Sequence, residues 1–64
     1  MPDRDWYAQA YLRLTSLVEQ LELAEELNAE DPDPMDATTL AALRGRLVAR
    51  RDEYRRRAAG EDPR

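Results

Sequence analysis

Residues 28–34 read Asn-Ala-Glu-Asp-Pro-Asp-Pro, and this short acidic segment divides the chain into two parts. A residue that precedes proline is driven toward extended backbone geometry, and proline itself has no amide hydrogen to donate. The two Asp-Pro pairs therefore end a helix. Asp33 followed by Pro34 is also typical of a helix N-cap with proline at the first helical position. The segment thus predicts the end of one helix and the start of another.

The residues before this break predict one amphipathic helix over residues 5–27, with Asp3 or Asp5 as its N-cap. Its apolar side chains recur at spacings of three and four, without an intervening Gly or Pro. They are Tyr7, Ala10, Tyr11, Leu14, Leu17, Val18, Leu21 and Ala24. The stripe spans about 140° of the helix circumference, counting Trp6 on its flank.

The residues after the break predict a second helix over residues 34–59, with Gly60 as a left-handed residue at its C-terminus. Its main stripe consists of Leu40, Leu43, Leu47, Tyr54 and Ala58. We therefore expect an all-α, antiparallel helical hairpin forming a single domain over residues 1–64. An acidic, Pro-containing loop at 28–33 joins the helices, and residues 60–64 form a flexible tail. Pairing the two helices antiparallel about this loop places Tyr11 near Tyr54.

Composition excludes several classes of site. The 64 residues include no Cys and no His, so disulfides, Cys/His zinc sites and catalysis by either side chain are impossible. We expect no enzyme activity, no cofactor and no metal. The acidic group Glu19, Glu22, Glu25 and Glu26 is interpreted as a solvated surface, since EF-hand spacing is absent. Acids at a helix C-terminus oppose the helix dipole, so we expect Arg44 and Arg46, or a partner's arginines, nearby.

The chain has no apolar run near the length of about 20 residues that a membrane span needs, so we expect no membrane contact. Residues 1–5 are polar and of mixed charge, unlike a secretory signal, and this favours a cytoplasmic location. All ten basic residues are Arg, which indicates a GC-rich bacterial or phage genome.

Charge is unevenly distributed along the chain. Residues 1–36 hold ten acids and two Arg, whereas residues 37–64 hold eight Arg and four acids. The loop end of the hairpin is therefore acidic and its open end is basic. Because chains this small usually need a disulfide, a metal or a partner chain, we expect a homodimer. Because opposite charges attract, we expect the two hairpins to pack antiparallel into a four-helix bundle. The acidic loop end of each hairpin then lies against the basic open end of the other.

The expected self-interface combines leucines of both stripes with small residues of the second helix. Its residues are Leu14, Leu17, Leu21, Leu43, Gly45, Leu47 and Ala49. Glycine in the middle of a helix costs about 1 kcal/mol relative to alanine, and a close backbone contact would explain its presence. The spacing Ala41-x-x-x-Gly45-x-x-x-Ala49 places small residues one turn apart, as such a contact requires.

These features predict a non-catalytic module that self-associates and binds a protein partner. One alternative is a nucleic-acid-binding regulator that uses Arg50, Arg51, Arg55, Arg56 and Arg57. Asp52 and Glu53 each precede an arginine by four residues, in the pairs Asp52–Arg56 and Glu53–Arg57. Ion pairs at this spacing stabilise a helix and favour a structural role for these arginines instead. A second alternative is an accessory subunit of a larger enzyme or phage assembly, in which the partner replaces the second hairpin.

Two resemblances bear on these alternatives. The layout is similar to that of Rop-type hairpin dimers, which regulate plasmid RNA pairing, although the likeness is one of architecture and not of motif. The sequence Leu14-x-x-Leu17-Val18-x-x-Leu21-Glu22 resembles the first helix of exonuclease VII small subunits. The segment 28–34 departs from that family's short Gly-containing turn. Neither resemblance assigns a functional residue.

Overall fold

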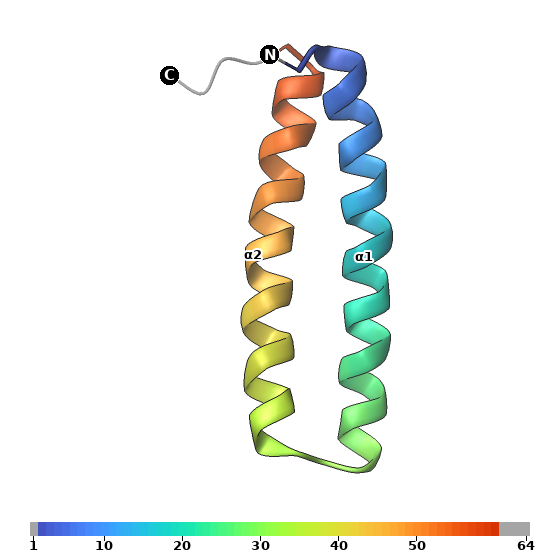
Figure 1. Ribbon diagram of the computed structural model, residues 1–64, viewed down its shortest axis with the longest axis vertical. Coiled ribbons are helices and arrows are strands. Elements are labelled where there is room, and N and C mark those ends of the chain that lie inside the picture. The colour runs from blue at the N-terminus through green and yellow to red at the C-terminus, as the bar shows by residue number, and fades with distance from the viewer. Residues whose placement is uncertain (1, 61–64) are drawn as a thin grey trace.

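A computed structural model describes residues 2–60 and confirms the all-α helical hairpin. Helix α1 spans Arg4–Glu30 and helix α2 spans Pro34–Ala58. The helices run antiparallel side by side, with the turn at one end and the start of α1 beside the end of α2 at the other (Figure 1). Because the described chain contains only these two helices, the hairpin is one helix thick. Both of its broad faces are consequently uncovered.

The predicted capping residues are confirmed. The Asp3 Oδ1 atom accepts a hydrogen bond of 2.9 Å from the amide of Trp6 at the start of α1. At the start of α2, Asp33 Oδ1 accepts from the amides of Met35 at 2.9 Å and Asp36 at 3.3 Å. Each carboxylate satisfies amides that have no partner within the helix. Gly60 has the predicted left-handed backbone, with φ of 84°.

The predicted loop at 28–33 is too long, because α1 continues three residues beyond position 27. The connection shortens to Asp31–Asp33, and the Asn28 side chain bridges it. Asn28 Nδ2 donates to the Asp33 carbonyl at 3.3 Å, and Asn28 Oδ1 accepts from the Asp33 amide at 3.1 Å. Helix α2 ends one residue before the predicted position 59. Of the predicted tail 60–64, only Gly60 lies within the described residues.

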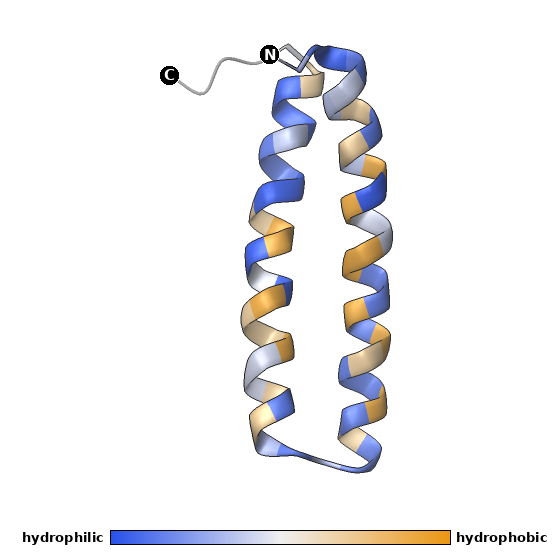
Figure 2. Ribbon diagram, in the orientation of Figure 1, coloured by the Kyte–Doolittle hydropathy of each residue, from blue (hydrophilic) through white to orange (hydrophobic). Residues whose placement is uncertain are grey.

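The seam between the helices buries little. Among residues 2–60, only Leu14 and Val18 are buried, at 9% and 2% exposure, and α2 contributes no buried residue. Apolar residues occur along most of α1 and in the middle of α2, whereas the open end of α2 is hydrophilic (Figure 2). Most apolar side chains of the hairpin therefore remain partly or largely in contact with water.

Replacing Leu14 by alanine is expected to lower the free energy of unfolding by about 2 kcal/mol, since it removes one of the two side chains that fill the seam. The matched control is Leu12→Ala on the same helix, where the side chain is 65% exposed. That control is expected to change stability by less than about 0.5 kcal/mol. Urea unfolding, followed by circular dichroism at one fixed protein concentration, measures the free energy of unfolding of both variants. An equal loss of stability in the two variants would contradict this description of the core.

Candidate interaction surface

One broad face of the hairpin carries large apolar side chains that the described chain covers only in part. Trp6, Leu17 and Leu27 are 48%, 46% and 68% exposed on α1, and Leu43 is 42% exposed on α2. Trp6 and Leu17 lie on one flank of α1, because a step of 11 residues is close to three helical turns, whereas Leu27, 10 residues further on, is rotated about 80° farther from α2. We call this surface, with Ala24, the tryptophan face. Exposed apolar groups gathered on one face are typical of an interaction site.

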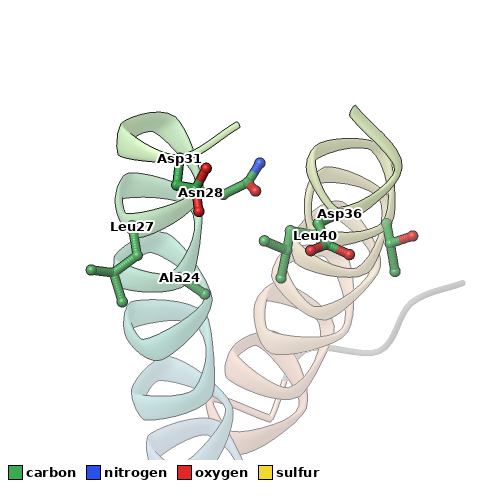
Figure 3. A pocket seen from close by; sticks show the side chains of 7 residues that line it. Ala24, Leu27, Asn28, Asp31, Asp36 and Leu40 are labelled. Atoms are coloured by element: carbon green, nitrogen blue, oxygen red, sulfur yellow. The ribbon is translucent and has the colours of Figure 1, made fainter. Parts of the chain in front are cut away.

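A cavity of about 440 Å³ opens between the helices near the turn. Its lining residues are Ala24, Leu27, Asn28, Asp31, Asp36, Thr39 and Leu40 (Figure 3). Ala24 and Leu27 also belong to the tryptophan face, so the cavity lies on that face. Leu43 follows Leu40 by less than one turn and continues the same surface along α2. Apolar side chains meet carboxylates here, which suits a ligand group with an apolar body and a hydrogen-bond donor.

The open end of the hairpin is closed by three aromatic rings. The rings of Trp6 and Tyr7 lie 5.3 Å apart, and Tyr54 lies 5.7 Å and 5.3 Å from them, all edge to face. The sequence predicts Tyr11 as the neighbour of Tyr54. The rings that Tyr54 contacts, Trp6 and Tyr7, lie about one helical turn nearer the open end. Edge-to-face pairs of this kind stabilise packing beyond their buried area. Trp6 nevertheless keeps about half of its surface open.

Arg57 ties this aromatic cluster to α2. Its Nη1 donates to the Tyr7 hydroxyl at 2.9 Å, its Nη2 donates to Glu53 at 2.9 Å, and its guanidinium lies 5.4 Å from the Tyr7 ring centre. The hydrogen bond to Tyr7, followed by that to Glu53, raises the pKa of Arg57 above its ordinary value. Arg57 is therefore engaged within the hairpin.

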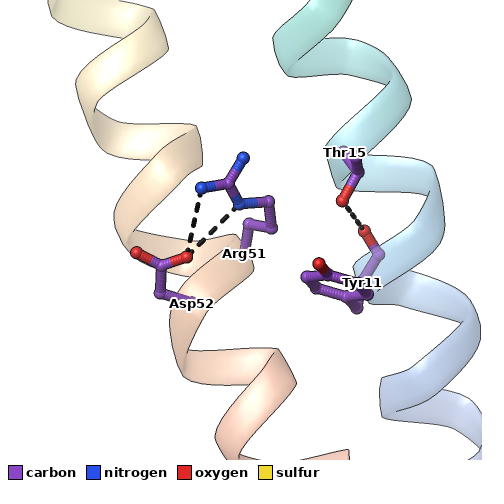
Figure 4. Close-up of polar contacts among 4 residues, drawn as sticks. All are labelled: Tyr11, Thr15, Arg51 and Asp52. Atoms are coloured by element: carbon purple, nitrogen blue, oxygen red, sulfur yellow. Dashed lines mark hydrogen bonds and ion pairs between the residues drawn. The ribbon is translucent and has the colours of Figure 1, made fainter.

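The remaining arginines of the basic cluster divide into paired and open side chains. The predicted Glu53–Arg57 pair is confirmed, whereas Asp52 pairs with its neighbour Arg51 at 3.2 Å (Figure 4). Beside this pair on α1, the Thr15 hydroxyl donates to the Tyr11 carbonyl at 2.9 Å (Figure 4). Within residues 2–60, no ion pair engages the exposed arginines Arg50, Arg55 and Arg56. Arg50 lies 6.0 Å from the Tyr54 ring centre.

The acidic end contains one ion pair between the helices. Arg44 Nε donates to Glu25 Oε1 at 2.7 Å, which confirms Arg44 as a positive neighbour of the acids on α1. The hydrogen bond and charge of Glu25, with a smaller effect of Glu22, raise the pKa of Arg44. Across the described part of the chain, the acids do not gather into a metal-binding group.

The seven residues of the expected self-interface lie in three different places. Leu14 is buried within the hairpin, whereas Leu17 and Leu43 are exposed on the tryptophan face, and Leu21 and Leu47 are half-buried between the helices. Gly45 and Ala49 are exposed on the side of α2 away from α1. A β-carbon added at Gly45 would meet no atom within 4 Å. The interface residues therefore do not form one continuous patch.

The sequence did not point to the cavity or to the Arg57–Tyr7 contact. The cavity depends on how the helices are rotated about their axes, and hydropathy spacing does not specify that rotation. The Arg57–Tyr7 contact joins residues 50 positions apart. The sequence did place Tyr7 and the Arg cluster at the same end of the predicted hairpin, and this was the one indication of the Arg57–Tyr7 contact.

Comparison with protein-family models, with curated proteins and with solved structures finds no match for the chain. Neither helix within residues 2–60 combines the length and the apolarity needed to cross a bilayer.

Replacing Gly45 by alanine tests whether the small residues of α2 form an interface. The open space around Gly45 and its position in the helix predict that Gly45→Ala raises stability by about 1 kcal/mol. Thermal unfolding checks this expectation, and sedimentation at several concentrations measures self-association of the same variant. Weaker association of the variant would instead indicate a close contact at Gly45.

Proposed function

We propose that this chain is a non-catalytic protein-interaction module that self-associates through the tryptophan face and presents its remaining surface to a protein partner. The observation that carries the proposal is the exposure of Trp6, Leu17, Leu27 and Leu43 on one face of a hairpin that buries only two residues. Covering apolar surface is the main driving force of protein association. A second copy of the hairpin would provide a surface of matching length.

The separation of charge also supports self-association. Acids gather at the turn and arginines at the open end, so each copy carries both halves of a complementary pair. Charges of this kind select orientation and partner more than they add affinity. The absence of His and Cys from the sequence removes the commonest catalytic side chains and supports a role in binding.

The solution mass measured over a dilution series tests this proposal. The wild-type chain is expected to sediment as a dimer at micromolar concentration, and Leu17→Glu is expected to shift it to monomer because a carboxylate would be buried in the contact. The matched control is Leu12→Glu, which places the same charge on the outer side of α1, where Leu12 is 65% exposed. That variant is expected to remain a dimer.

A wild-type chain that stays a cooperatively folded monomer at these concentrations would contradict self-association. A monomer that becomes helical only when a partner is added would favour the alternative of an accessory subunit, in which another protein covers the tryptophan face.

Binding of nucleic acid is the second candidate function, because Arg50, Arg55 and Arg56 are exposed and make no ion pair within residues 2–60. Contacts to phosphate release counterions, so affinity of this kind falls steeply with salt. Titration with single-stranded and duplex RNA at two salt concentrations tests it. The main proposal predicts no salt-sensitive binding. Salt-sensitive binding that is lost on changing all three arginines to glutamine would establish the second candidate instead.

A further inference from the structure

We propose that the partner on the tryptophan face is a second copy in antiparallel orientation, with Trp6 of each copy inserted into the cavity of the other. This inference rests on the proposed self-association and specifies its geometry. It follows from the order of residues along α1, the position of the cavity, the shape of the face and the distribution of charge.

The residues along one flank of α1 are arranged symmetrically about Leu17. In order, the strip at alternating spacings of three and four is Trp6, Ala10, Arg13, Leu17, Gln20, Ala24 and Leu27. Suppose that a second α1 lies antiparallel across this strip, related to the first by a twofold axis near Leu17. Large residues then lie against large residues, and alanine lies against alanine. Parallel packing would instead place Arg13 beside Arg13.

The distances along the helix agree with insertion of Trp6 into the cavity. Trp6 lies 11 residues from Leu17, or about 16 Å along the axis, and Leu27 lies 10 residues away on the other side, or about 15 Å. The twofold axis therefore carries Trp6 of one copy to the level of Leu27 in the other. The cavity is at this level and on this face.

The chemistry of the cavity suits an indole. It is an open groove of about 440 Å³, which is room enough for an indole side chain to lie in it. Ala24, Leu27 and Leu40 provide apolar contacts, and the carboxylates of Asp31 and Asp36 can accept the indole N–H, which is a donor only. Tyr7 and Tyr54 support Trp6 from within its own chain. A half-exposed tryptophan held in this way is typical of an interface anchor.

Shape and charge favour the same arrangement. The tryptophan face extends along the 27 residues of α1, about 40 Å, so a second hairpin laid along it would meet a surface of its own length. Residues 19–36 hold eight acids and no arginine, while residues 1–18 and 46–60 together hold eight arginines and four acids. Antiparallel packing brings each acidic end to a basic end, and parallel packing brings like charges together.

Single cysteines test this geometry, because the natural chain has none. A mixture of the A10C and A24C variants is expected to form a 10–24 disulfide under mild oxidation, since these positions face each other across the axis. Either variant alone is expected to stay unlinked, because its two cysteines would lie about 20 Å apart. The matched control mixes L12C with L23C, which occupy similar levels on the outer side of α1, and it is expected to stay unlinked.

The fluorescence of Trp6, the only tryptophan in the chain, gives a second measurement. Its emission is expected to move to shorter wavelength as dilute monomer associates. Leu27→Ala is expected to raise the dissociation constant at least about tenfold, whereas Leu12→Ala changes it less than about twofold. Both side chains are largely exposed in the hairpin, at 68% and 65%, so neither change removes its core.

The possible outcomes separate the two proposals. A dimer by mass that yields 10–10 and 24–24 disulfides, or no 10–24 disulfide, overturns the antiparallel geometry and leaves self-association in place. Unchanged Trp6 emission on association overturns the insertion of Trp6. A monomeric mass at all concentrations overturns both the geometry and the proposed function.

Discussion

A pair of helices shares a single seam, and the rest of this structure depends on that constraint. Each helix turns one flank toward its neighbour and leaves the remaining flanks to solvent. Here the seam encloses only Leu14 and Val18, even though the chain is rich in leucine. Most apolar side chains outside the seam therefore remain exposed to solvent within one chain. Hydrophobic burial, the largest favourable contribution to folding and to association, is incomplete within one chain.

The two ends of the hairpin are organised by different interactions. At the turn, Asp33 and Asn28 hold the connection by hydrogen bonds to the backbone. At the open end, aromatic rings and Arg57 close the gap between helix ends that no loop joins. In between, Arg44 and Glu25 cross the seam near the turn. The result is a rod with an acidic end, a basic end and an apolar flank.

The sequence was sufficient to predict the architecture, because its main signals are local. The spacing of leucines specified both helices, and the Asp-Pro pairs specified the turn and the cap at Asp33. The error at the loop arose because Asn28 stays helical while its side chain bonds to Asp33, a contact that no propensity describes. The cavity was not predictable for a different reason. It depends on the relative rotation of two helices, which many small packing contacts determine together.

The bridge between Asn28 and the Asp33 backbone depends on a side-chain amide at position 28. The side-chain amide donates with its nitrogen and accepts with its oxygen, so both halves of the group are used. Spontaneous deamidation would leave a carboxylate, which cannot donate to the Asp33 carbonyl. It would also add a negative charge beside Asp31 and Asp33, where the chain already concentrates acids. One carboxylate in place of this amide would thus remove one of the two hydrogen bonds that close the turn.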